Sequence, residues 1–395
     1  MVVRALPQTI IAGAGPAGLA LAAELGARGV AVEVHAPSPH APWPNSYGAW
    51  EQGLRELRLE DAVLRVFDSP RVVSATGTQR TLRASYCRMD STRLQRNLLE
   101  RARNAGVRLV AKTHSADSFR SNQRCLYIDA TGGALQREAP RFDSYQTAYG
   151  LWLDVPPERQ ATTGMTLMDF EGENGSSPSF LYAMNEGRTG SLERLFVQET
   201  ILSSRRVHPL SDLRNRLLDR LRLAGIPSER TLGEERCVIP LGRDLPNGQE
   251  GCLPFGASAA MVHPATGYQL SHALQKAAPT AEAIAHNLSK GVEQASLAGL
   301  EAIWPDSHRL SWKLYRWSAS VLREMNREEI GEFVESFFGL PTDQWLGFME
   351  GTLRPGQILS ALGGVFGGCS SRLRLRLIRS ISASGTGIGR LLLAG

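Results

Sequence analysis

The sequence predicts an α/β protein in which a Rossmann-like parallel sheet carries an inserted antiparallel-sheet domain and a helical carboxyl-terminal region. Three observations support this fold class. A glycine-rich turn follows a short apolar run at the start of the chain, strand-like segments gather between residues 149 and 207, and helical, aromatic-rich patterns fill residues 300–395. With 395 residues, the chain can bury a large core and should divide into two or three lobes.

The opening segment, residues 8–39, has the pattern of a strand, a turn, a helix and a second strand. Three glycines stand at GxGxxG spacing directly after the apolar run. The first permits the tight turn, the second lets the backbone approach a pyrophosphate, and the third lets the helix pack on the strand. The alternative is a glycine-rich turn without a ligand. We expect dinucleotide binding by Gly13, Ala14, Gly15, Pro16, Ala17 and Gly18, with the amino end of a helix over residues 17–28 facing the phosphates.

Ribose recognition is not evident in this opening segment. An acidic residue usually closes the second strand and holds the ribose hydroxyls. Ala36 stands at that position, and neither Glu33 nor His35 is clearly placed to substitute.

Two later segments have the pattern of further cofactor contacts. Residues 126–133, LYIDATGG, are typical of a buried parallel strand that ends beside a cofactor, although the same letters also make an ordinary turn. Residues 252–288 combine a strand, a small-residue turn, the loop HPATGY and a long alanine-rich helix that begins near Tyr268. The order of the three segments predicts a two-dinucleotide-binding FAD fold. Its further cofactor-binding candidates are Asp129, Gly132, Gly256, Pro264, Thr266 and Gly267.

Residues 149–207 contain four strand-like runs separated by polar loops, which predict an antiparallel sheet above a substrate cavity. Asp169, Gln198 and Glu199 lie at or near strand ends, either as solvated polar residues or as catalytic groups. The expected domain limits are 1–140 for the first part of the FAD-binding domain, 141–234 for the inserted substrate domain, 235–290 for the second part of the FAD-binding domain and 291–395 for the helical region.

Three remaining segments have simpler interpretations. Residues 54–64 are expected to be helical, and residues 237–241 to form a strand. Residues 371–380, SRLRLRLIRS, alternate arginine with leucine and could form a strand or a helix. They favour a solvated edge and contact with an anionic membrane surface about equally.

Composition narrows the classes of partner. The formal charge is +5 and the pI about 9.1, but the arginines are scattered and no nucleic-acid module is present, so no nucleic-acid partner is expected. The five cysteines lack CxxC spacing, so we expect neither a disulfide framework nor a metal site. Few residues precede the first strand and no long apolar run occurs, so a cytoplasmic protein without a spanning helix is expected.

Several peptides resemble the flavoprotein lycopene cyclases of plants and cyanobacteria, over nearly the whole chain. GAGPAGLALA resembles the first motif of that family, WPNSYGAW its WPNNYGVW, MVHPATGY its MVHPSTGY, and MDF with PSFLYAM its MDW and PTFLYAM pair. FVQET stands where the family has FLEET, and FFGLPTDQWLGFMEGTL is similar to its helical carboxyl-terminal segment.

The resemblance implies a lycopene β-cyclase that acts on lycopene or another linear carotene. It further implies a non-covalent FAD, active when reduced, with NAD(P)H as the reductant, and peripheral association with a pigment-bearing thylakoid or plasma membrane. Protonation of a terminal double bond, attack on the cation by the neighbouring alkene and loss of a proton would form the ring. A buried carboxyl can hold such a proton, and aromatic faces stabilise a cation.

The sequence departs from the family at the residue usually given acid/base work. That residue is the first glutamate of FLEET, and here it is Gln198. The catalytic candidates are therefore Glu199 first and Asp169 second, with the flavin as a further proton source. Two other functions stay open: an FAD-dependent monooxygenase or isoprenoid reductase, and a paralogue that binds carotenoid without turnover.

Overall fold

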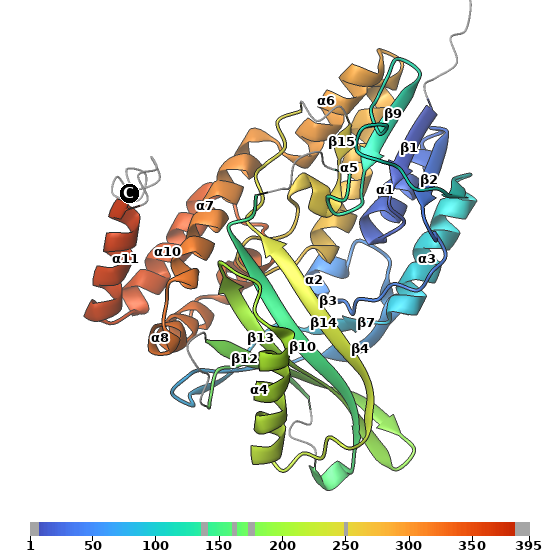
Figure 1. The fold of residues 1–395 in the computed structure, drawn as a ribbon. Helices are drawn as coiled ribbons and strands as arrows, with labels where there is room; N and C mark the ends of the chain where they lie inside the picture. The colour runs from blue at the N-terminus through green and yellow to red at the C-terminus, as the bar shows by residue number, and fades with distance from the viewer. Residues whose placement is uncertain (1–7, 136–140, 160–163, 173–177, 249–251, 384–395) are drawn as a thin grey trace, which may run out of the picture.

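The computed structural model describes residues 8–135, 141–159, 164–172, 178–248 and 252–383. Its described strands form three sheets, and most helices follow the last strand (Figure 1). The α/β fold class predicted from the sequence is confirmed, with a parallel sheet, an antiparallel sheet and carboxyl-terminal helices.

The first sheet is parallel throughout, with strand order β15-β9-β1-β2-β8. Its strands are β1 (Gln8–Ala12), β2 (Val32–Ala36), β8 (Arg108–Ala111), β9 (Cys125–Asp129) and β15 (Leu253–Pro254). Helix α1 (Pro16–Ala27) follows the glycine-rich turn and packs against α5 (Leu270–Leu288), while α3 (Ser91–Asn104) covers α1 from the other side. The three segments predicted to contact a cofactor therefore come from one sheet.

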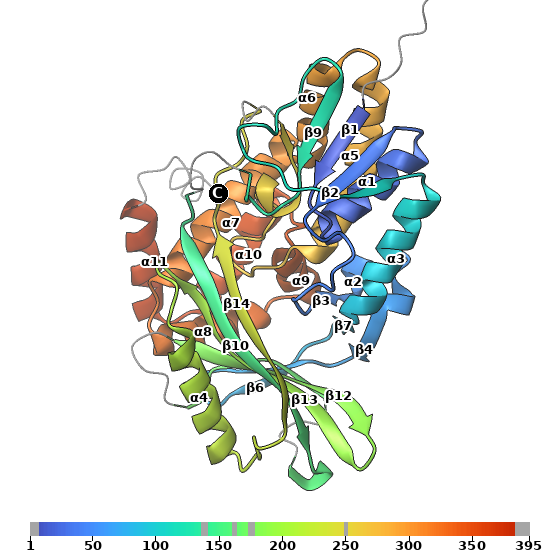
Figure 2. The ribbon, with the colours of Figure 1, turned by 45° about the vertical axis from the view of Figure 1, so that its right-hand side comes forward.

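The second sheet has seven strands in the order β14-β10-β13-β12-β11-β5-β6. Its strands are β5 (Arg71–Val73), β6 (Gln79–Thr81), β10 (Ser144–Val155), β11 (Met165–Asp169), β12 (Ser179–Thr189), β13 (Leu192–Ser204) and β14 (Thr231–Leu241). All neighbours are antiparallel except β5 and β11. Helix α4 (Leu210–Leu223) lies on one face of this sheet, as Figure 2 shows.

The edge strand β14 is longer than the strand expected over residues 237–241. It begins at Thr231 and pairs with β10 along its length. The expected domain limit between residues 234 and 235 therefore falls inside this strand. We propose that β14, β5 and β6 belong to the substrate sheet.

The third sheet is small and corrects one expectation. Strands β3 (Gly48–Trp50), β7 (Tyr86–Met89) and β4 (Val63–Phe67) form it in that order. The helix expected over residues 54–64 is wrong, since α2 (Glu51–Leu54) ends where that helix should begin. A single 3₁₀ turn (Glu60–Ala62) then leads into β4, whose pairing with β7 outweighs the local helical pattern.

The first of the carboxyl-terminal helices packs on α5 and on the parallel sheet, and the next packs on β13 of the second sheet. The carboxyl-terminal helices are α6 (Val292–Ile303), α7 (Asp306–Arg323), α8 (Arg327–Phe338), α9 (Thr342–Glu350), α10 (Pro355–Gly368) and α11 (Ser371–Ala383). The alternating segment 371–380 is thus helical, with Leu373 and Leu377 buried and Leu375 and Ile378 exposed. Among the described residues, no helix combines the length and apolarity that crossing a bilayer requires.

Candidate active site

One cavity of about 690 Å³ lies between the parallel sheet and the antiparallel sheet. Its wall includes the glycine-rich turn, the segment WPNSYGAW, five strands of the second sheet (β10 to β14) and the loop before α5. Because the carboxyl ends of β1, β9 and β15 meet at this cavity, it occupies the position where α/β sheets bind their ligands. The sheet above it contains the four strands that the sequence assigned to a substrate domain, β10 to β13, joined by β14, β5 and β6.

The glycine-rich turn has the geometry of a phosphate cradle. Gly13 has a φ of 110°, and a Cβ built there would lie 2.4 Å from the carbonyl oxygen of Ala130. A Cβ on Gly18 would lie 2.0 Å from the carbonyl oxygen of Gly13. A Cβ on Gly15 would meet no atom within 4 Å, and Gly15 lines the cavity. Gly13 and Gly18 are therefore needed for packing, whereas the space beside Gly15 faces the cavity.

The amino ends of two helices border the same cavity. Gly15, the residue before α1, and Gln269, the residue before α5, make no side-chain hydrogen bond to the helix end. Both line the cavity, so the first N–H groups of each helix border it. The chain thus presents two helix amino ends to a ligand, an arrangement suited to phosphates.

The other cofactor candidates divide into lining and supporting residues. Gly132, Thr266 and Gly267 line the cavity together with Pro16 and Ala17. Ala14, Asp129, Gly256 and Pro264 are not part of the lining. The buried Asp129 accepts hydrogen bonds from the backbone N–H and the hydroxyl of Thr131, so it fixes the turn after β9.

The end of β2 carries no free carboxylate at the position usual for ribose. Ala36, which the sequence places at that position, is buried. Glu33 binds His35 at 2.8 Å and Arg108 at 3.1 Å, and His35 also contacts His114 at 2.7 Å. Neither Glu33 nor His35 takes the place of the missing acid, because both are already engaged with each other and with these partners.

The pairing of the second sheet decides which polar residues face the cavity. In one transverse row, Tyr182 of β12 is opposite Gln198 of β13, which is opposite Gly150 of β10. Gly150 is opposite Glu235 of β14. Residues in one transverse row point to the same face, and Tyr182, Gln198 and Glu235 all line the cavity.

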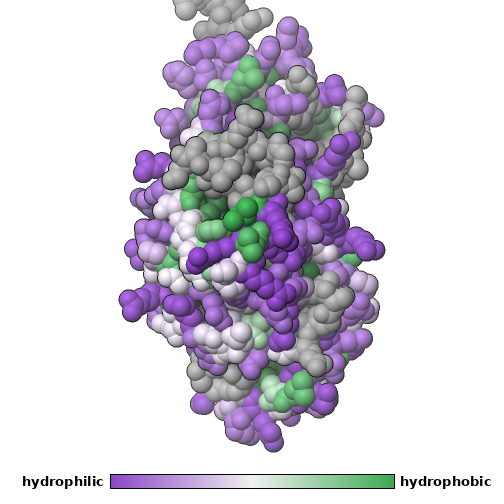
Figure 3. Space-filling model, turned by 90° about the vertical axis from the view of Figure 1, so that its left-hand side faces the viewer, coloured by the Kyte–Doolittle hydropathy of each residue, from purple (hydrophilic) through white to green (hydrophobic). Residues whose placement is uncertain are grey.

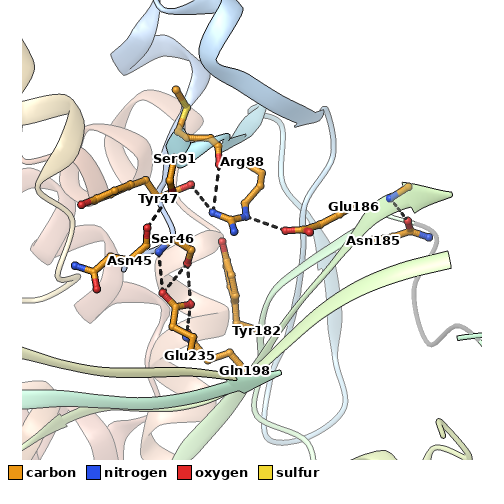
Figure 4. A network of polar contacts seen from close by, with 12 residues as sticks. Asn45, Ser46, Tyr47, Arg88, Ser91, Tyr182, Asn185, Glu186, Gln198 and Glu235 are labelled. Carbon is orange, nitrogen blue, oxygen red and sulfur yellow. Dashed lines mark hydrogen bonds and ion pairs between the residues drawn. The ribbon is translucent and has the colours of Figure 1, made fainter. Parts of the chain in front are cut away.

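Gly150 brings Gln198 and Glu235 together because it has no side chain between them. The Nε2 of Gln198 lies 3.5 Å from Oε2 of Glu235, while the Thr200 hydroxyl donates to Oε1 of Gln198. Ser46 donates its backbone N–H and its hydroxyl to the same carboxylate, at 2.8 to 2.9 Å (Figure 4). Glu235 is buried, and it is the only acidic residue among the described residues that line the cavity.

The two catalytic candidates from the sequence lie together, but on the opposite face. Glu199 follows Gln198 by one residue and so points away from the cavity, where it pairs with Arg220 of α4 at 2.9 Å. It also accepts a hydrogen bond from Ser179. Asp169 is in the same row as Glu199, and its backbone carbonyl accepts from Arg220. Neither Glu199 nor Asp169 lines the cavity.

Burial governs the protonation of both residues. It raises the pKa of Glu199, opposed by the nearby Arg220 guanidinium. Burial likewise raises the pKa of Asp169, opposed by a backbone hydrogen bond from Glu171. A raised pKa alone does not make a residue catalytic, because these carboxyls are separated from the cavity by the sheet.

Aromatic side chains form much of the remaining wall. Tyr86 contacts Tyr182 and Tyr268 with ring centroids 6.4 and 6.3 Å apart, and the hydroxyl of Tyr182 donates to that of Tyr86. Burial raises the pKa of Tyr182 and of Tyr268 well above the usual value, so both stay neutral phenols. The wall therefore offers electron-rich ring faces without phenolate charge.

A buried arginine in the wall is matched by its own carboxylate. Arg88 binds Glu186 at 3.0 Å and donates to the backbone carbonyl of Tyr47, as Figure 4 shows. The side chains of Arg88 and Glu186 are each 7% exposed. Arg88 is therefore paired with Glu186 and not with Glu235.

The sequence prediction missed Glu235 because the strand was expected to begin at residue 237. Extending the alternation of β14 backwards from Cys237 would have placed Glu235 on the same face. The segment WPNSYGAW also makes hydrogen bonds within the site. It supplies Ser46 to Glu235, and its Trp43 donates to the carbonyl of Ala14 in the glycine-rich turn.

Comparison with known proteins gives consistent results. The family described as "Lycopene cyclase protein" matches residues 8–375. An "Uncharacterized carotenoid cyclase" of Deinococcus radiodurans is 32% identical, with 98% of this chain and 96% of that protein covered. A chloroplastic lycopene beta cyclase of an Oncidium hybrid cultivar is 30% identical, with 93% and 83% covered.

Two solved structures share the fold. A geranylgeranyl bacteriochlorophyll reductase-like protein from Thermoplasma acidophilum has a TM-score of 0.65 at 13% identity, covering 90% of this chain and 96% of that one. A flavin-dependent brominase has a TM-score of 0.63 at 14% identity, covering 90% and 98%. At these identities the likeness concerns the fold alone.

Proposed function

Because this chain belongs to the lycopene cyclase protein family, we propose that it is a lycopene β-cyclase. It would convert lycopene through γ-carotene to β-carotene, without net redox change, in carotenoid biosynthesis. The observation that carries the proposal is the cavity between the two sheets, which combines aromatic walls with a buried carboxylate at the carboxyl ends of the parallel strands.

The wall chemistry suits a carbocation. A proton added to the terminal alkene leaves a tertiary cation, which the neighbouring double bond attacks to close the ring. The faces of neutral Tyr86, Tyr182 and Tyr268 each stabilise such a cation by roughly 0.5 to 2 kcal/mol. A carboxylate in a poorly hydrated cavity contributes more per group, because its charge is weakly screened there.

The turn and the helix ends fit FAD as the cofactor. The open space beside Gly15 and the amino end of α1 would receive the pyrophosphate, and Gly132 would border the same site. The loop through Thr266 and Gly267 and the amino end of α5 would hold the flavin end. Reduced flavin, when bound, supplies negative charge near the cation, and we propose NAD(P)H as its reductant.

The cofactor part of the proposal can be tested by two glycine substitutions. Gly15→Ala should lower the FAD content of the purified protein while leaving unfolding of the FAD-free form unchanged, because Gly15 has an ordinary φ of −78° and its Cβ would enter open space. Gly18→Ala should destabilise the FAD-free form, because its Cβ would meet the backbone of Gly13. Full FAD content in Gly15→Ala would show that the pyrophosphate does not bind at this turn.

The membrane part rests on α11. Leu375 and Ile378 are 57% and 45% exposed on this arginine-rich helix, and Figure 3 shows hydrophobic and strongly hydrophilic side chains side by side on one face of the molecule. We propose that this helix contacts an anionic, pigment-bearing membrane, from which the chain would take its carotene.

Expression in lycopene-accumulating cells, followed by chromatography of the pigments, tests the activity. We expect γ- and β-carotene to appear. Unchanged lycopene with a folded, FAD-loaded protein would refute the cyclase function. Stoichiometric NAD(P)H consumption would then indicate a monooxygenase or reductase, and lycopene binding without turnover would indicate a carotenoid-binding paralogue.

A further inference from the structure

We propose that Glu235 is the base that takes the proton from the ring cation, and that Gln198 and Ser46 position it. This inference rests on the proposed cyclase function and assigns one step of it to a residue. It starts from the transverse row in which Gln198, Gly150 and Glu235 are direct neighbours across three strands.

The hydrogen bonds around Glu235 all use its carboxylate oxygens as acceptors. Ser46 donates twice, through its backbone N–H and its hydroxyl, and the amide of Gln198 approaches from the other side. Because Thr200 donates to Oε1 of Gln198, the Nε2 hydrogens of this amide point at Glu235. These donors leave both carboxylate oxygens of Glu235 as hydrogen-bond acceptors, which is the role of a group placed to take up a proton from the substrate.

Position singles out Glu235 among the carboxylates of the region. Glu199 and Asp169 lie on the α4 face of the sheet, and Glu186 is bound to Arg88. Of the described residues that line the cavity, Glu235 alone has a carboxylate. Gln198 cannot replace it, because an amide neither accepts nor releases a proton usefully near neutral pH.

The step is balanced without an oxidant. The C–H bond beside the cationic carbon breaks, its electron pair becomes the ring double bond, and the proton moves to an Oε atom of Glu235. Release of that proton to solvent restores the carboxylate and equals the proton taken up when the alkene was protonated. Before transfer, the negative charge of Glu235 also faces the cation and stabilises it.

The first test compares two neighbouring glutamates on β14. Glu235→Gln should lower kcat by about 10² to 10⁴, the usual range for a lost acid/base group, with FAD content and unfolding midpoint kept. Glu234→Gln is the matched control, because Glu234 is exposed on the other face of the same strand, and it should leave kcat unchanged. A kcat within threefold of wild type in Glu235→Gln would overturn the proposal.

A swap separates a base from a merely structural carboxylate. In Gln198→Glu combined with Glu235→Gln, the carboxylate returns to the same row, across Gly150 from its former place. The kcat of this double variant should be at least about tenfold higher than that of Glu235→Gln. Recovery supports a proton acceptor, because Gln198→Glu does not restore the contact of Glu235 with Ser46. A double variant no faster than Glu235→Gln would show that Glu235 only holds the Ser46 turn, which overturns the proposal.

Loss of FAD from the variant and an inactive wild type are two outcomes that need separate treatment. If Glu235→Gln loses FAD, Glu235→Asp is measured instead. Aspartate keeps the carboxylate charge, but its side chain is shorter by one methylene group. The proposal then requires kcat to fall at least about tenfold at unchanged KM, because misplacement of about 1 Å is costly for proton transfer. If the wild type forms no cyclic carotene, the proposed cyclase function itself fails, and this appears before any variant is measured.

Discussion

The two faces of the antiparallel sheet carry glutamates that differ mainly in what covers them. Glu235 faces a cavity and accepts from Ser46, whereas Glu199 faces α4 and is paired with a guanidinium. Both side chains are buried, so burial does not distinguish them. Alternate residues of a strand face opposite sides of a sheet. A buried carboxylate on one sheet can therefore face either a helix, in a structural role, or a cavity, where it can react. The predictions below test this difference, and each compares groups by their surroundings.

The largest effect is expected for Glu199→Gln. This change leaves Arg220, whose side chain is 16% exposed, without its carboxylate. Removing one partner of a buried pair should lower the free energy of unfolding by about 3 kcal/mol. Denaturant unfolding measures this loss. The kcat of the folded, FAD-loaded fraction should stay within about threefold of wild type, since Glu199 lies outside the cavity. A stable Glu199→Gln variant without cyclase activity would indicate that Glu199, and not only Glu235, has a catalytic role.

A second comparison concerns the pH dependence of stability at a partly buried carboxyl. Glu350 at the end of α9 is half-buried, its Oε1 has no hydrogen-bond partner in the described structure, and burial raises its pKa to about 7 from 4.5. Between these values the folded protein keeps a proton that the unfolded chain has lost, so the stability contribution of Glu350 falls as pH rises through this window.

Glu350→Gln is neutral at every pH and escapes this loss. The melting temperature of the variant should equal that of wild type at about pH 4 and exceed it by a few degrees at about pH 8. Thermal unfolding at both pH values checks this. Asp343→Asn, exposed on the same helix, is the control and should open no such gap. An identical melting difference at both pH values would contradict the raised pKa of Glu350.

A smaller effect is expected for Ser46→Ala. It removes the hydroxyl contact to Glu235 and keeps the backbone N–H contact. The kcat should fall by about fivefold, the equivalent of roughly 1 kcal/mol for one hydrogen bond. Pigment assays with purified protein measure it. Ser211→Ala on α4, far from the cavity lining, should have no effect. A Ser46→Ala enzyme as fast as wild type would show that the hydroxyl does not position Glu235.

The smallest effect concerns the two faces of α11. Replacing the exposed Leu375 and Ile378 by serine should weaken binding to anionic vesicles by about threefold, since the arginines remain. Vesicle cosedimentation measures it. Leu223→Ser, which removes a leucine that is 76% exposed on α4, is the matched control and should not change binding. Equal losses in both proteins would argue against a specific contact through α11.

The sequence by itself determined the fold class and the position of the glycine-rich turn. These depend on local pattern, since Gly13, Gly15 and Gly18 follow an apolar strand and precede a helix in a single short segment. The family was also predictable, because its distinctive peptides survive as contiguous letters. Runs of β-branched and aromatic residues between polar loops likewise predicted four strands of the second sheet, although the limits of its strands were not predicted, as the late start expected for β14 shows.

Only the tertiary structure decided which glutamate meets the cavity. Gln198 and Glu199 are neighbours in sequence but lie on opposite faces of the sheet. The local sequence does not determine which of these faces α4 covers. Glu235 comes 37 residues after Gln198, yet it meets that side chain across Gly150 because β10 lies between β13 and β14. Strand order is a non-local choice, made by the packing of the whole sheet. The sequence therefore supplied the carboxylates, and the order of the strands decided which one faces the cavity.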